Sequence, residues 1–137
     1  MSLVLDASLA LTWYFQDEVT PATEAILDRV AGSGAIVPAL WRLEVANGLQ
    51  VAVRRGRISA AYRDGSLADL AQMNIETDLE THSHAWSVTL RLAERHELTL
   101  YDAAYLELAQ RRRLPLATLD QQLRRAGDDL GVRLLGL

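Results

Sequence analysis

The sequence predicts an α/β fold built around a mainly parallel sheet. Short apolar segments alternate along the chain with longer stretches of helical periodicity. Strands that alternate with helices are typical of βαβ units, in which neighbouring strands run parallel. Half of the 137 residues are hydrophobic, which is enough for the core of one domain. We therefore expect residues 1–137 to form a single domain.

The first elements follow from a short apolar run and two helical stretches. Residues 2–6 predict a short buried strand, and helices are expected over residues 8–16 and 20–32. Thr20 is expected to cap the second helix, with Pro21 at its first position.

The middle of the chain continues the alternation. Residues 35–37 predict a minimal strand. Pro38 precedes a long helix that is expected to continue to about residue 55, where Gly56 ends it. A further helix is expected over 59–72, and a third strand over 74–77.

The last third has the same pattern. Helices are expected over 82–95 and 101–112, a strand over 114–117, a short helix over 120–126 and a final strand over 132–135. In parallel sheets of this kind, ligands bind beyond the carboxyl ends of the strands.

Composition excludes several classes of protein. The absence of Cys excludes disulfides, thiolate zinc sites and a Cys nucleophile, and it suits a reducing cytoplasm. The start of the chain lacks a basic segment followed by a long apolar stretch, so we expect no signal peptide and a cytoplasmic location. No apolar run approaches the roughly 20 residues of a membrane span, so we expect no membrane association.

The basic residues are all Arg, and many are clustered. The clusters lie at residues 54–57, 111–113 and 124–125, while the net charge of −4 argues against indiscriminate binding of nucleic acid. Arg is well suited to phosphate oxygens. The alternative interpretation is that each cluster is a solvated helix end, where a cation also favours the helix dipole.

Four isolated carboxylates lie in or against apolar runs that should form the core. They are Asp6, Glu44, Asp102 and Asp120. An ionised carboxylate near a core is costly unless it is paired or holds a metal ion, and the chain contains no Lys to pair with any of them. A shared divalent cation is the economical explanation.

Helix capping is the alternative interpretation for three of these residues. Asp6 and Asp120 stand where a helix N-cap is expected, and Asp102 follows Thr99 at the spacing of a capping box. Glu44 has no such explanation, because it lies within a helix. Its neighbours Asn47 and Gly48 are small, which predicts room beside the carboxylate for an ion, water or substrate.

The chemistry of such a group points to phosphodiester hydrolysis. Converging carboxylates repel one another and raise one another's pKa, and a divalent cation reverses that effect. Carboxylate oxygens are hard ligands, which suit Mg²⁺ or Mn²⁺ rather than zinc. Such an ion lowers the pKa of bound water and stabilises charge on a phosphoryl group.

The chain resembles the PIN-domain ribonucleases, specifically the VapC-type toxins of bacterial toxin–antitoxin pairs. Four segments in this order and spacing carry the resemblance: Leu5-Asp6-Ala7-Ser8, residues 38–49, residues 98–109 and residues 114–123. The resemblance covers essentially the whole chain.

The resemblance implies a three-layer α/β/α sandwich with strand order 3-2-1-4-5 and an acidic catalytic quartet. Asp6 and Asp102 would be the main metal ligands, and Glu44 and Asp120 would complete the site. Thr118 matches a hydroxyl that commonly lines this pocket. The implied activity is a Mg²⁺-dependent endoribonuclease, with Mn²⁺ as a substitute ion.

The resemblance also implies partners. A cognate antitoxin would hold the enzyme inactive, the toxin would form homodimers, and promoter DNA would be bound only through the antitoxin. RNA would be the substrate, with selectivity expected from the Arg residues around 54–57 and 111–113.

Three other functions compete with this one. A phosphoacceptor receiver domain also has an acidic Mg²⁺ pocket, but it needs an acidic pair after the first strand and a Lys, and both are missing here. A binding module with a dead site is disfavoured by the intact quartet. A nuclease acting on single-stranded or flapped DNA would keep the same site and change the substrate.

Two other features of the sequence are not expected to contribute to the active site. His82 and His84 cannot share one face of a helix, so we expect no metal site there. We expect residues 13–15, which are aromatic, to belong to the core and a dimer surface rather than to stack on RNA bases.

Overall fold

A five-stranded sheet forms the centre of the protein in the computed structural model, which describes residues 2–137. All neighbouring strands are parallel, in the order β3-β2-β1-β4-β5. The strands are β1 (Val4–Leu5), β2 (Ala35–Val37), β3 (Ile75–Thr77), β4 (Leu116–Ala117) and β5 (Leu134–Leu135). The predicted parallel sheet and the strand order implied by the family resemblance are therefore both confirmed.

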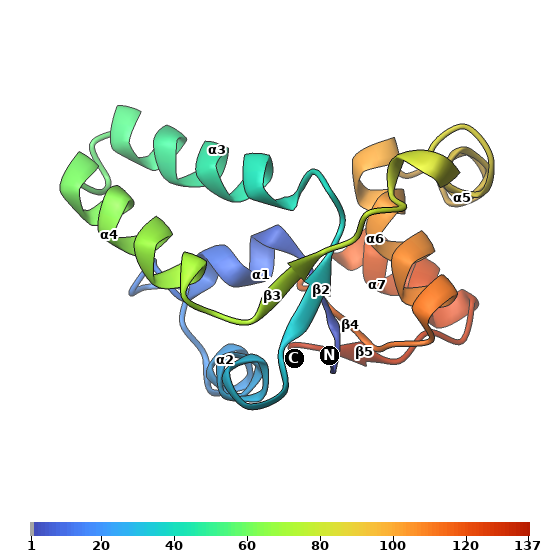
Figure 1. Cartoon of the computed structure of the whole chain (residues 1–137), viewed down its shortest axis with the longest axis horizontal. Coiled ribbons are helices and arrows are strands. Elements are labelled where there is room, and N and C mark those ends of the chain that lie inside the picture. Colours follow the sequence, from blue (N-terminus) through green and yellow to red (C-terminus); the bar gives the residue numbers. More distant parts are fainter. Residues whose placement is uncertain (1) are drawn as a thin grey trace.

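Helices cover the sheet on both sides and complete three layers. In Figure 1, α1 to α4 lie toward the left of the strands, and α5, α6 and α7 lie toward the right. The helices are α1 (Ala7–Thr12), α2 (Pro21–Ser33), α3 (Trp41–Arg54), α4 (Ala60–Ala71), α5 (Val88–His96), α6 (Leu100–Arg112) and α7 (Gln121–Asp129), with a 3₁₀ turn, η1, at His82–His84. None of these helices is long and apolar enough to cross a membrane.

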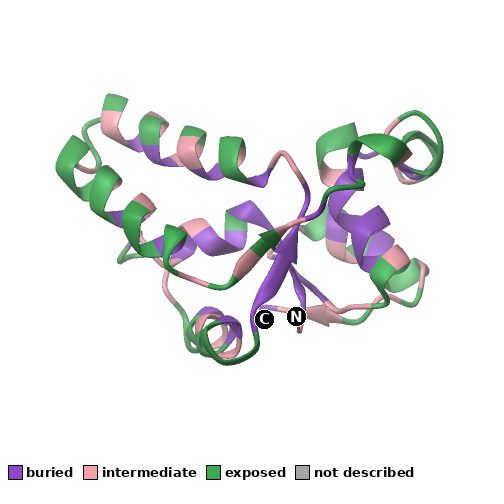
Figure 2. Cartoon of the chain, in the orientation of Figure 1, coloured by how far each residue is buried: buried purple, intermediate pink, exposed green. Residues whose placement is uncertain are grey.

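The core lies where the central strands meet α6. The strands β1, β2 and β4 are buried throughout, and α6 is buried continuously over residues 103–109 (Figure 2). Strands that are covered on both faces need apolar side chains in both directions, which explains why they appear in the sequence as uninterrupted apolar runs.

The second helix begins and ends as the sequence predicts. The Thr20 hydroxyl accepts a hydrogen bond from the Thr23 N–H, the Thr23 hydroxyl accepts one from the Thr20 N–H, and Pro21 occupies the first turn. At the other end, Gly34 adopts a φ of 73°, which L side chains rarely adopt.

Three predicted helix boundaries are wrong. The helix expected over 8–16 ends at Thr12, and the next three residues donate backbone hydrogen bonds three residues back instead of four. The helix expected over 82–95 is interrupted, since Ser87 leaves the helical region with φ −121° and ψ −99°. The helix expected to end at residue 126 continues to Asp129.

The strand order brings the carboxyl ends of β1 and β4 together at the point where the order of the strands reverses. Val4 pairs with Leu116, and Leu5 pairs with Ala117. Asp6 follows β1 directly, and Asp120 precedes α7 shortly after β4. Both carboxylates therefore lie at the position where open α/β sheets bind ligands.

Candidate active site

Asp6 is a buried carboxylate at the junction of β1 and α1. Only 5% of the residue is exposed. Its oxygens accept hydrogen bonds from the Ser8 hydroxyl at 2.8 Å, the Thr118 hydroxyl at 2.7 Å and the Ser8 N–H at 3.4 Å. Burial raises the pKa of Asp6, and these hydrogen bonds only partly offset the effect. Asp6 thus caps α1, as the capping interpretation predicted, and also faces Thr118.

Glu44 reaches the same region from α3. Its carboxylate Oε1 accepts a hydrogen bond from the Tyr105 hydroxyl at 2.5 Å. Glu44 is half-buried, and burial raises its pKa, with further increases from repulsion by Asp6 and Asp102. The Glu44 carboxylate is therefore close enough to both aspartates for their charges to raise its pKa.

Asp102 lies in the first turn of α6. Thr99 caps that helix by accepting a hydrogen bond from the Asp102 N–H at 3.1 Å. Burial raises the pKa of Asp102, followed by repulsion from Asp120 and Asp6, whereas the Thr99 hydroxyl lowers it. The predicted cap is therefore real, and it leaves the Asp102 side chain facing other carboxylates.

Asp120 caps α7. Its Oδ1 accepts a hydrogen bond from the Leu123 N–H at 2.8 Å, and its own N–H donates to the Thr118 hydroxyl at 3.1 Å. Because Thr118 in turn donates to Asp6, a short chain of hydrogen bonds links the starts of α7 and α1. Thr118 is completely buried, so this link is shielded from water.

The structure places these four carboxylates in one electrostatic environment, and we call them the carboxylate quartet. Asp6, Asp102 and Asp120 each raise the pKa of at least one other member by charge repulsion, and Glu44 is among the members whose pKa is raised. No ion pair within residues 2–137 includes any of the four. The quartet therefore concentrates negative charge that the described side chains do not neutralise.

The donor set fits a magnesium ion by its chemistry, although the side chains do not form a ready-made cage. Across residues 2–137, no three Asp, Glu or His side chains are gathered closely enough to hold a metal ion. Mg²⁺ commonly keeps several waters and takes only one or two carboxylates from the protein. An uncompensated group of hard oxygen donors meets that requirement.

The small residue beside Glu44 has a different role from the predicted one. A Cβ atom added at Gly48 would lie 2.5 Å from Leu11 Cδ1. The space at Gly48 is thus already filled by α1, and it allows α1 and α3 to pack closely. The prediction that Gly48 leaves room for an ion or substrate is therefore wrong. Gly48 affects the site only indirectly, because the close packing of α1 and α3 places Asp6 and Glu44.

Sequence reasoning missed Tyr105. Its side chain is fully buried, and it lies three residues after Asp102, on the same face of α6. That spacing was visible in the sequence, but a Tyr in an apolar helix is normally assigned to the core. Its contact with Glu44 depends on the packing of α6 against α3, which sequence alone does not specify.

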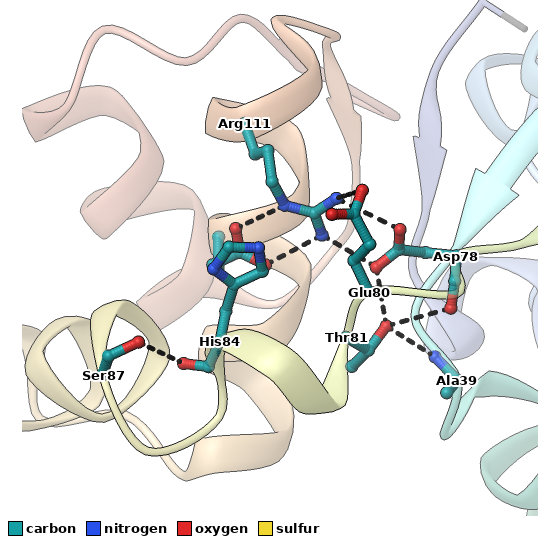
Figure 3. Close-up of polar contacts among 8 residues, drawn as sticks. Ala39, Asp78, Glu80, Thr81, His84, Ser87 and Arg111 are labelled. Atoms are coloured by element: carbon teal, nitrogen blue, oxygen red, sulfur yellow. Dashed lines mark hydrogen bonds and ion pairs between the residues drawn. The ribbon is translucent and has the colours of Figure 1, made fainter.

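Sequence reasoning also missed the Arg111 cluster, in which Arg111 forms ion pairs with Asp78, Glu80 and Glu107. Figure 3 shows Arg111 with Asp78 and Glu80. Arg111 donates two hydrogen bonds to Asp78 and two to Glu107, at 2.7–3.1 Å, and lies 3.5 Å from Glu80. The Thr81 hydroxyl donates to Asp78 and accepts from the Ala39 N–H, which ties this cluster to the start of α3. The guanidinium of Arg111 is therefore held by carboxylates of the protein itself.

Comparison with known proteins gives a consistent result. The model of the family named PIN domain matches residues 3–129. A protein of Pyrobaculum aerophilum named Ribonuclease VapC3 is 30% identical over 123 residues, covering 90% of this chain and 92% of that protein. A Mycobacterium tuberculosis protein of the same name is 34% identical over 104 residues, covering 74% of this chain and 72% of that protein.

Solved structures show the same fold. A crystal structure of a Pyrobaculum aerophilum protein matches with a TM-score of 0.68 and 24% identity, covering 92% of this chain and 86% of that one. VapBC2 from Rickettsia felis, bound to a DNA fragment from its promoter, matches with a TM-score of 0.66 and 11% identity, covering 98% and 97%. FitAcB from Neisseria gonorrhoeae matches with a TM-score of 0.62 and 16% identity, covering 97% and 96%.

Proposed function

The chain belongs to the PIN-domain family, and from that membership we propose that it is a Mg²⁺-dependent endoribonuclease, the toxin of a VapBC-type toxin–antitoxin pair. The observation that carries the proposal is the carboxylate quartet, in which Asp6 and Asp120 follow β1 and β4 and the other two acids come from α3 and α6. Charge repulsion couples its four acids, and none of them has a cationic partner among residues 2–137. Relatives named as ribonucleases support RNA as the substrate class.

The proposed roles follow from where each side chain lies. Asp6 and Asp102 hold the divalent ion, Mg²⁺ or Mn²⁺, and Glu44 and Asp120 complete the site. Thr118 keeps Asp6 in place through its 2.7 Å hydrogen bond. When bound, the ion supplies an acidic water and stabilises charge on the phosphoryl group.

Binding of RNA needs cations on the surface, since the chain carries a net charge of −4. Arg57 is committed to ion pairs with Asp17 and Glu18 and stacks over Phe15 at 4.2 Å from the ring centroid. Among the Arg residues of the segments 54–57 and 111–113, from which RNA selectivity is expected, Arg54, Arg55, Arg112 and Arg113 are exposed and form no ion pair within residues 2–137. These four are the better candidates for phosphate contacts.

We further propose an antitoxin partner, a homodimer and a cytoplasmic location. Two of the structural neighbours, VapBC2 and FitAcB, support a protein partner. Leu79 and Trp86 are each 92% exposed, which is unusual for large apolar side chains and is explained if another chain covers them. Promoter DNA would be contacted through the antitoxin.

The experiment is cleavage of total and structured RNA by the purified chain, freed of antitoxin, with Mg²⁺ or Mn²⁺ and with EDTA. We expect cleavage that requires the metal and falls more than about 100-fold in Asp102→Asn, because that change removes a ligand charge but keeps the shape of the side chain. Single-stranded and flapped DNA are tested in parallel. Full activity of Asp102→Asn in the presence of metal would contradict the proposal. Cleavage of DNA but not RNA would show that the substrate is DNA instead of RNA.

A further inference from the structure

Tyr105 connects three elements of the candidate active site through one hydroxyl. It lies on α6 and is the largest side chain among the fully buried residues. Its hydroxyl donates to Glu44 Oε1 on α3 at 2.5 Å and accepts from the Ala7 N–H, at the start of α1, at 3.4 Å. Asp6 is the residue directly before that N–H.

The arrangement restricts Glu44. A tyrosine hydroxyl has one proton to donate, and here Glu44 Oε1 receives it. A glutamate side chain can adopt several rotamers. Without the hydrogen bond, repulsion from Asp6 and Asp102 would favour rotamers that move the Glu44 carboxylate away from those two residues. The bond therefore opposes that movement and leaves the second oxygen, Oε2, for contacts within the site.

We propose that Tyr105 is a positioning residue: its hydroxyl holds Glu44 toward Asp6 and determines which carboxylate oxygen of Glu44 is available to the reaction. This inference rests on the proposed function of the carboxylate quartet. It goes beyond it by assigning a role to a residue that is neither acidic nor exposed.

The test is Tyr105→Phe, which keeps the ring and removes the hydroxyl. Groups that orient metal-site residues typically contribute 10–100-fold to activity or metal affinity. We expect kcat for RNA cleavage to fall about 10–100-fold with KM unchanged, and the Kd for Mn²⁺, measured by calorimetry, to rise about tenfold. The matched control is Tyr62→Phe, which removes an equivalent tyrosine hydroxyl that donates to the Tyr14 carbonyl at 2.7 Å; kcat and Kd should not change.

A double-mutant cycle separates positioning from a structural role. In the Glu44→Gln background, Tyr105→Phe should change kcat and the Mn²⁺ Kd less than about threefold, because the carboxylate that it positions is already gone. Equal effects of Tyr105→Phe in both backgrounds would overturn the inference. So would a Tyr105→Phe protein with the Mn²⁺ affinity of the wild type.

The two proposals fail in distinguishable ways. If the wild type binds Mn²⁺ but cuts no RNA, the proposed substrate is wrong, and the Mn²⁺ affinities still decide the role of Tyr105. If the wild type binds no Mn²⁺, both proposals are overturned. If Tyr105→Phe does not fold, wild-type protein labelled at the tyrosine Cζ carbon is titrated with Mg²⁺, and a Tyr105 signal that does not shift overturns the inference.

Discussion

The carboxylate quartet and the Arg111 cluster are two acidic groups with opposite electrostatics. Asp6 and Asp78 are equally buried, at 5% and 4% exposure. Burial raises the pKa of Asp6, and no cation among residues 2–137 opposes it. Burial acts on Asp78 in the same direction, but the hydrogen bonds and charge of Arg111, with help from Thr81, hold its pKa below the usual value.

The difference shows which acids stabilise the fold and which are available for chemistry. The Arg111 cluster connects the segment after β3 to α6 and, through Thr81, to the start of α3. Its charges are neutralised by a side chain of the protein itself. Among residues 2–137 the quartet has no such side chain, so its charge is available to a cation from solution.

The largest expected effect is the loss of the half-buried guanidinium of Arg111. Arg111→Ala should lower the free energy of unfolding by about 3–5 kcal/mol, because it leaves the buried Asp78 and Glu107 without a partner. The matched control is Arg57→Ala, which also removes two ion pairs, but exposed ones. Urea denaturation of both variants checks this, and equal losses would show that burial does not distinguish the two arginines.

The next effect concerns how the free energy of unfolding depends on pH. The contributions of Asp6 and Asp78 to this dependence should have opposite signs. The pKa of Asp6 is raised in the folded state, so ionisation destabilises the fold, and stability falls as pH rises from the unfolded value near 3.8 toward the folded value. The pKa of Asp78 is lowered, so its contribution is present above 3.8 and is lost as pH falls through the folded value.

Two isosteric variants test this contrast in EDTA. The free energy of unfolding of Asp6→Asn, minus that of the wild type, should be larger at pH 7 than at pH 3.5. Asp78→Asn should be less stable than the wild type at pH 7 and should approach the stability of the wild type at low pH. Denaturant midpoints at both pH values measure the differences. Parallel pH profiles for the two variants would mean that the surroundings of the two aspartates are not different after all.

The sequence predicted the elements that depend on local pattern, including the cap at Thr20 and the acids that follow β1 and β4. The individual capping interpretations of Asp6 and Asp120 were correct as well, because a carboxylate can cap a helix with one oxygen and face a site with the other. Local patterns therefore located the quartet but could not separate its two roles.

Contacts between distant segments were not predictable. Arg111 and Asp78 are 33 residues apart, and Asp78 lies in an irregular segment whose path depends on packing against α6. Gly48 was interpreted as empty space because the position of Leu11 was unknown. The break at Ser87 likewise depends on backbone angles that a helical sequence pattern does not reveal.

The central claim is that the carboxylate quartet binds a divalent cation. It is tested most directly by thermal unfolding in EDTA and at increasing Mg²⁺ concentrations. Wild-type Tm should rise with Mg²⁺ concentration, since a ligand that binds only the folded state stabilises it. The rise should disappear in Asp102→Asn and persist in Arg57→Ala. A wild-type Tm that does not respond to Mg²⁺ or Mn²⁺, or an equal rise in Asp102→Asn, would contradict the account.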